Sequence, residues 1–153
     1  MTDRRFGSIA EIIDFAIQRE IDAAAGYATI AGRAATPALR ELADDLRRQE
    51  ESHRRLLEGL TPEALRELGT SFVPDLHIVD ALADERLSGD MSLQDMLIFA
   101  AKKEAQAVAL YESLARMSAA SGHERVFLFL AGQEREHKLK LEAEYEKQVL
   151  QEN

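Results

Sequence analysis

Apolar residues recur every three or four positions along four long stretches of the chain, and the alternation of apolar and polar residues that is typical of strands does not occur. Four helices are therefore predicted, at about residues 8–33, 37–59, 92–117 and 122–150. Three of the predicted starts carry a capping signal, namely Ser8-x-x-Glu11, Thr36-Pro37 and Ser121-x-x-Glu124, and the third helix is expected to start at Ser92. The pattern predicts an all-α fold.

The lengths of the connections predict how these helices pair. Residues 34–36 and 117–121 form short loops, so the first two helices and the last two should each form an antiparallel αα-hairpin. Residues 60–91 connect the hairpins. We expect this crossover to run the length of a four-helix bundle and to start the second hairpin at the end where the first began.

Composition limits the classes of protein to which the chain can belong. Its 153 residues suffice for one domain, residues 1–153, and are too few for two. The net charge of −9 and the scattered arginines argue against a nucleic-acid or membrane partner. The sequence has no cysteine, which excludes disulfides and thiolate metal sites. Charged residues interrupt the N-terminal apolar segment, so it is neither a signal peptide nor a membrane span, and we expect a cytoplasmic protein.

The two predicted hairpins repeat each other at an offset of 84 residues. Each half contains a glutamate, then a tyrosine seven residues later, then the motif Gln-Glu-x-x-His. The paired positions are Glu20 and Glu104, Tyr27 and Tyr111, Gln49 and Gln133, Glu50 and Glu134, and His53 and His137. A single Glu-x-x-His usually belongs to a solvated helix face. The second copy, at matching positions, favours a shared function instead.

The four repeated glutamates and two histidines lie on the apolar faces of their predicted helices. Glu20, for example, lies between Ile17 and Ala24, and the other five interrupt apolar stripes in the same way. Four ionised carboxylates in a core would be costly and would repel one another. Two divalent cations would neutralise them, so the pattern predicts a dinuclear metal site. One glutamate from each of two helices plus Glu-x-x-His from each of the other two is the ligand set of ferritin-like di-iron and di-manganese proteins.

With these motifs, the chain resembles the di-iron domain of rubrerythrins, in the ferritin-like superfamily, from about Ile9 to Tyr145. The resemblance implies that Glu50 and Glu134 bridge two metal ions, that Glu20 and Glu104 are terminal ligands, and that His53 and His137 each bind one metal. It also implies that Tyr27 and Tyr111 match the tyrosines found behind the ligands in that family. Simple aromatic packing is the alternative for these two residues.

The sequence departs from the rubrerythrin pattern in two respects. Rubrerythrins carry a rubredoxin domain with four cysteines, whereas this sequence has none, so electrons would come from an external donor. The family also has an extra glutamate one turn after the carboxylate of the third helix, and this position is Ala107 here. The predicted site is therefore a symmetric one with six ligands.

The resemblance leads us to expect a non-haem di-iron enzyme that reduces hydrogen peroxide or dioxygen with external electrons. A ferroxidase or iron-handling protein is the alternative, and a bundle that binds metal only structurally is a third. The expected cofactor is two iron ions, although oxygen and imidazole ligands also suit manganese. We expect a homodimer.

Several other ionisable residues are expected to have no role in the site. His77 and His123 lie outside the repeated motifs. Glu51 and Glu136 flank the ligands but face other sides, and Glu142, Glu144 and Glu146 should form a solvated face near the end of the fourth helix.

Overall fold

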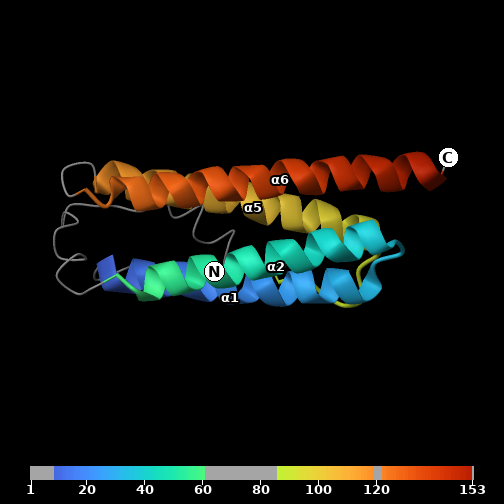
Figure 1. The fold of residues 1–153 in the computed structure, drawn as a ribbon, viewed down its shortest axis with the longest axis horizontal. Helices are drawn as coiled ribbons and strands as arrows, with labels where there is room; N and C mark the ends of the chain where they lie inside the picture. Colours follow the sequence, from blue (N-terminus) through green and yellow to red (C-terminus); the bar gives the residue numbers. More distant parts are fainter. Residues whose placement is uncertain (1–8, 61–85, 119–121, 153) are drawn as a thin grey trace, which may run out of the picture.

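The computed structural model describes residues 9–60, 86–118 and 122–152. Within these ranges the chain forms four helices and no strand: α1 (Ile9–Arg33), α2 (Pro37–Glu58), α5 (Leu93–Met117) and α6 (Glu124–Glu152). The helices lie lengthwise beside one another, as Figure 1 shows. The predicted all-α four-helix bundle is confirmed, and the helix ends lie within about two residues of those expected, the usual uncertainty of such boundaries.

Local signals explain where two of the helices begin. The Thr36 hydroxyl accepts a hydrogen bond from the Leu39 N–H at 3.2 Å and is followed by Pro37, and the Ser92 hydroxyl accepts one from the Asp95 N–H at 3.1 Å. Ser121, the first residue of the predicted capping box Ser121-x-x-Glu124, lies outside the described residues. Gly122 has a left-handed φ of 84°, so it cannot be the first residue of a helix, and α6 begins only at Glu124. Ser8, predicted to cap the first helix, lies outside the described residues.

The helices pack as two antiparallel hairpins, α1 with α2 and α5 with α6 (Figure 1). The Arg33 guanidinium, at the end of α1, donates to the carbonyl oxygens of Gly89 at 2.9 Å and Met91 at 3.3 Å, just before α5. The second hairpin therefore starts where α1 ends, and the prediction that it starts where the first hairpin began is wrong. Because α2 returns the chain to the beginning of α1, a crossover that spans the bundle must lead to the opposite end. The predicted crossover lies mostly outside the described residues.

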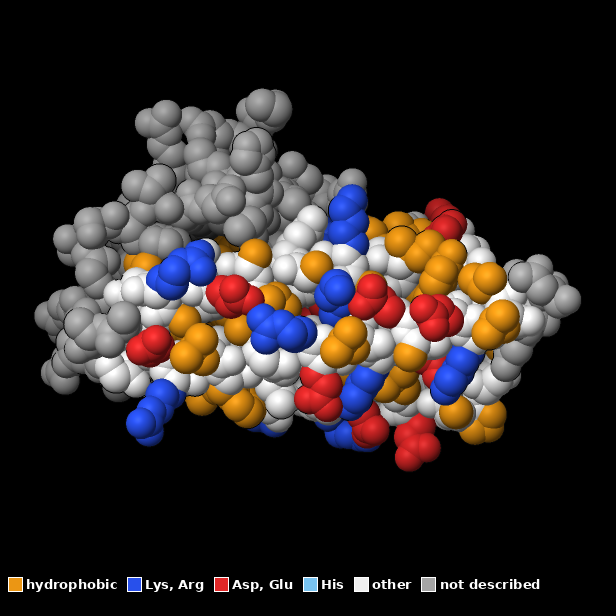
Figure 2. All heavy atoms as spheres, turned by 90° about the horizontal axis from the view of Figure 1, so that it is seen from above, with side chains coloured by type: hydrophobic (Ala, Val, Ile, Leu, Met, Phe, Trp, Pro, Cys, Tyr) orange, Lys and Arg blue, Asp and Glu red, His pale blue; other side chains and the backbone are white. Residues whose placement is uncertain are grey.

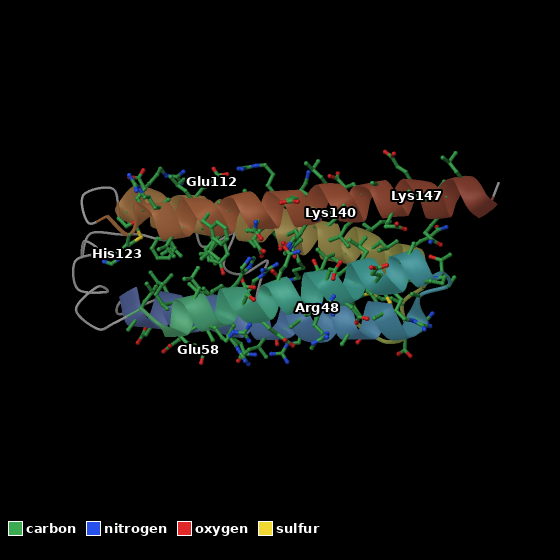
Figure 3. The ribbon with its side chains drawn as sticks, in the orientation of Figure 1. Arg48, Glu58, Glu112, His123, Lys140 and Lys147 are labelled. Atoms are coloured by element: carbon green, nitrogen blue, oxygen red, sulfur yellow. The ribbon has the colours of Figure 1, made fainter. Side chains whose placement is uncertain are left out.

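The interior consists of two apolar clusters with a polar belt between them. One cluster gathers the first half of α1 with the second half of α5 and includes Phe127 and Leu130 of α6. The other gathers the second half of α1 with the first half of α5 and includes Leu39 and Leu46 of α2. Figure 3 shows nitrogen and oxygen atoms between the helices near the middle of the bundle. Apolar packing on both sides therefore holds the buried polar groups in place.

The surface carries both signs of charge. On the face shown in Figure 2, Lys and Arg side chains are interspersed with Asp and Glu side chains over the part of the chain that is described. Some surface charges are paired one helical turn apart, such as Lys138 with Glu142 at 3.1 Å. Among the described helices, none has a stretch apolar and long enough to cross a membrane.

Candidate metal centre

The polar belt contains the six side chains that the repeat singled out. Glu20 comes from α1 and Glu104 from α5, while α2 and α6 each contribute a glutamate and a histidine one turn apart. None of the six is more than 3% exposed: Glu20, Glu50, His53, Glu104, Glu134 and His137. The structure thus brings all six predicted residues together, from four helices, into one buried cluster.

The donor atoms of this cluster fall into two overlapping groups. Glu20, Glu50, His53 and Glu134 can each direct one atom so that all lie within 4.8 Å of one another, and the same holds for Glu50, Glu104, Glu134 and His137. Glu50 and Glu134 belong to both groups, whereas the other four residues belong to one each. The arrangement is therefore that of two adjacent cation sites that share two carboxylates.

Each of the six residues keeps one buried atom without a hydrogen-bond partner among the described residues. These atoms are Oε2 of Glu20 and Glu104, Oε1 of Glu50 and Glu134, and Nδ1 of His53 and His137. The Nδ1 atom of His53 lies 3.1 Å from Glu50 Oε1 and 3.2 Å from Glu134 Oε1, and that of His137 lies 3.4 and 3.3 Å from the same two oxygens. Buried polar atoms are rarely left in this way unless an ion completes their bonding. The donor set therefore fits a pair of divalent cations.

Two tyrosines link the hairpins by holding the terminal glutamates. The Tyr111 hydroxyl on α5 donates to Glu20 Oε1 on α1 at 2.5 Å, and the Tyr27 hydroxyl on α1 donates to Glu104 Oε1 on α5. Burial raises the pKa of both tyrosines, and the nearby carboxylates raise it further. Both hydroxyls therefore keep their protons and hold one oxygen of each carboxylate, which leaves the other oxygen free.

Gln49 fixes the orientation of one histidine, a role that the sequence did not reveal. Its Oε1 atom on α2 lies 2.7 Å from His137 Nε2 on α6, so Nε2 donates to the glutamine oxygen and Nδ1 faces the carboxylates. The rings of His53 and His137 stack with centroids 5.8 Å apart at an interplanar angle of 12°. The repeated glutamine in Gln-Glu-x-x-His was the available signal.

Arg19 is the unexpected member of the cluster. This residue of α1 is 6% exposed, and its guanidinium contacts all four glutamates. Nη1 lies 3.2 Å from Glu20 Oε1 and 2.9 Å from Glu50 Oε2, and it contacts Glu134 Oε2 more closely still. Nη2 lies 3.1 Å from Glu104 Oε1. Burial opposes its charge, yet the four carboxylates raise its pKa further above the ordinary value. Lys103 stands at the equivalent position of the second repeat, which was the one hint in the sequence.

Burial and neighbouring charges shift the pKa values of the clustered groups in different directions. Burial, together with Glu104 and Glu20, raises the pKa of Glu50 to about 8, and burial likewise raises the pKa of Glu134. Burial also opposes ionisation of Glu104, but Arg19 and His137 outweigh it and lower the pKa of that carboxyl to about 2. Burial disfavours the charged form of His53, but Glu134, Glu20 and Glu50 raise its pKa to about 12. The cluster therefore attracts positive charge strongly.

Most of the residues expected to lie outside the site do so. Glu51 pairs with Arg47 at 3.0 Å and Glu136 with Lys140 at 3.3 Å on the surface. His123 is half-buried at the start of α6, away from the middle of the bundle (Figure 3). His77 lies outside the described residues.

The prediction that Glu144 is solvated is wrong, because only 8% of its surface is exposed. It follows His137 and Leu141 on the inward face of α6, at a spacing of three to four residues, and pairs with Lys147 at 3.6 Å. Ala107, where the third helix has no extra glutamate, is fully buried in the apolar cluster that contains Leu57 and Tyr111.

Comparison with known proteins identifies the family. The family model for rubrerythrin matches residues 11–145, which span both hairpins and all six clustered side chains. A solved structure of a hypothetical protein from Pyrococcus furiosus is similar, with 26% identity, a TM-score of 0.72, and coverage of 92% of this chain and 89% of that one. No curated protein matches the sequence. On the strength of the family match, the chain belongs to the rubrerythrin family.

Proposed function

We propose that this protein is a di-iron oxidoreductase that reduces hydrogen peroxide or dioxygen with electrons from an external donor. The observation that carries the proposal is the convergence of six unpartnered donor atoms in a belt sealed between two apolar clusters. The family match supports a di-iron, ferritin-like protein. A cytoplasmic location and a homodimer belong to the same proposal.

The donor set suits iron and manganese equally well. It offers carboxylate oxygens and imidazole nitrogens without a thiolate, which is the preference of redox-active non-haem iron and of manganese. Glu50 and Glu134, the members of both groups, would bridge the two ions. Glu20 with His53, and Glu104 with His137, would complete one ion each. Four carboxylates would balance the charge of two divalent ions.

The bound iron pair would supply the two electrons that cleave an O–O bond, and the protein would supply the surroundings. The protonated hydroxyl of Tyr111 donates to Glu20, and that of Tyr27 donates to Glu104. Each terminal carboxylate therefore has a fixed orientation. Gln49 keeps the proton of His137 on Nε2. Phe127 and Leu130 on one side and Leu46 and Met96 on the other keep water away. The site is thereby arranged before the metal arrives.

Anaerobic reconstitution with Fe²⁺ tests this proposal. We expect two irons per chain and, on addition of peroxide, near-ultraviolet absorption from the oxidised iron pair. The double variant Glu50→Ala/Glu134→Ala should bind no iron yet remain helical, while Glu51→Gln, which alters the adjacent surface carboxylate, should bind iron like the wild type. A stoichiometry near zero, or zinc retained against excess iron, would contradict the di-iron assignment.

Ferroxidase activity uses the same residues, so a turnover experiment must separate the two functions. With an artificial electron donor and catalytic protein, an oxidoreductase should consume peroxide or dioxygen over many turnovers without net use of Fe²⁺. A ferroxidase should instead stop when added Fe²⁺ is exhausted. Gel filtration adds a second criterion, because iron storage requires a closed shell of many subunits whereas peroxide reduction requires only a monomer or dimer.

A further inference from the structure

Arg19 lies among the carboxylates that the proposed metal ions would need. Its Nη1 atom is within 3.2 Å of Glu20 Oε1 and 2.9 Å of Glu50 Oε2, and it also contacts Glu134 Oε2. Its Nη2 atom is 3.1 Å from Glu104 Oε1. Glu50 and Glu134 would need both oxygens to bridge two ions, and Arg19 holds one oxygen of each. The guanidinium and the metal pair would therefore compete for these two oxygens.

Charge balance leads to the same conclusion. Four carboxylates carry a charge of −4, and two divalent ions neutralise it completely. A guanidinium left in contact with those carboxylates would add an unbalanced positive charge to a site whose side chains are at most 3% exposed. Unbalanced charge in a buried site is strongly disfavoured. Arginine does not relieve this by losing its proton.

The structure offers a place to which Arg19 can move. A cavity of about 210 Å³ between α1 and α5 is lined by Arg19, Asp22, Arg86 and Glu104, among others. This volume is several times the roughly 30 Å³ of a water molecule in the liquid, so a guanidinium fits. Asp22 lies three residues after Arg19 on α1, a spacing that allows an ion pair. In this structure Asp22 Oδ2 lies 3.8 Å from Arg86 Nε.

We propose that Arg19 competes with the metal ions for the carboxylates: it offsets part of their negative charge until metal binds, and then moves into the adjoining cavity to pair with Asp22. This inference rests on the proposed metal centre. Arg19 raises the metal concentration at which the protein loads, and it keeps the four carboxylates compatible with a folded bundle before loading.

The internal repeat provides a natural comparison. Lys103 occupies the position equivalent to Arg19, one residue before Glu104, and lines the same cavity. Its Nζ atom lies over the Phe99 ring, 5.3 Å from the ring centroid. A substitution there removes one positive charge near the cavity without removing the guanidinium from the cluster. It is therefore the matched control.

Calorimetric titration with Fe²⁺ under anaerobic conditions tests the inference. We expect Arg19→Gln to bind two irons at least about tenfold more tightly than the wild type, which corresponds to about 1.4 kcal/mol, and Lys103→Gln to bind like the wild type. In apo protein, thermal unfolding should show a lower midpoint for Arg19→Gln alone. Equal or weaker Fe²⁺ binding by Arg19→Gln would overturn the inference. If neither the wild type nor any variant bound iron, the metal centre itself would be refuted.

Two further variants strengthen the test. Asp22→Asn should weaken Fe²⁺ binding by about two- to fivefold, the size of a partly exposed ion pair, but only while Arg19 is present. An equal effect in the Arg19→Gln background would contradict the movement toward Asp22. If apo Arg19→Gln fails to fold, Arg19→Lys serves instead. An ammonium makes fewer simultaneous contacts than a guanidinium, so this variant should bind Fe²⁺ more tightly than the wild type, and no gain would overturn the inference.

Discussion

Replacing Glu50 with glutamine should stabilise the apo protein at neutral pH. The ordinary pKa of a glutamate is 4.5, and burial with neighbouring carboxylates raises that of Glu50 to about 8. Between these values the folded protein holds a proton that the unfolded chain releases, so the wild type loses stability as the pH rises from 4.5 to 8. Glutamine mimics the protonated side chain at every pH, so the variant avoids this loss.

The magnitude follows from the size of the shift. At pH 7, about 2.5 pH units above the ordinary pKa of 4.5, Glu50 still holds its proton in the folded protein. At 1.36 kcal/mol per unit, this lowers the free energy of unfolding by about 3 kcal/mol. Glu50→Gln should recover about that much at pH 7 and almost nothing at pH 4.5. For a chain of this length, 3 kcal/mol corresponds to a rise of roughly 6–12 °C in Tm. The other buried groups are present in both proteins, so the difference between them reports the loss of the Glu50 charge together with its effect on its neighbours.

Urea unfolding followed by far-ultraviolet circular dichroism, with a metal chelator present, measures this difference at several pH values. Glu51→Gln is the matched control, since Glu51 is the next residue but pairs with Arg47 on the surface, and it should change stability little at any pH. With Fe²⁺ in place of the chelator the order should reverse, because the variant lacks a bridging ligand. A stability difference that is the same at pH 4.5 and pH 7, or a less stable apo variant at pH 7, would refute the reasoning.

Three other substitutions probe the surroundings of the cluster. Tyr111→Phe removes the hydrogen bond to Glu20 and should destabilise the apo protein by about 1–3 kcal/mol in urea; an unchanged midpoint would show that the bond contributes nothing. Gln49→Leu should weaken Fe²⁺ binding by about 10- to 100-fold because His137 loses its partner; unaltered affinity would contradict this role. Ala107→Glu, in the iron-loaded protein, should increase the ratio of peroxide to dioxygen reaction rates in stopped-flow experiments. No increase at unchanged iron content would count against the argument from the missing glutamate.

The sequence determined the helices and the inward position of the six polar residues. Helical periodicity is local, so Glu50 and His53, three residues apart within an apolar stripe, must face the same side of their helix. The repeat then implied that two equivalent hairpins meet face to face. The bundle and the burial of both Glu-x-x-His motifs followed from these two facts.

Tertiary structure decided which atoms meet within the cluster. The bonds from Tyr111 to Glu20 and from Gln49 to His137 cross between hairpins, and periodicity within one helix carries no information on such pairs. It also placed the start of the second hairpin, which depends on the path of the crossover rather than on either helix. Arg19 is the clearest case. A long arginine can point toward solvent or inward from the same helical position, and only the four carboxylates brought together by α1, α2, α5 and α6 draw its guanidinium into the centre of the bundle.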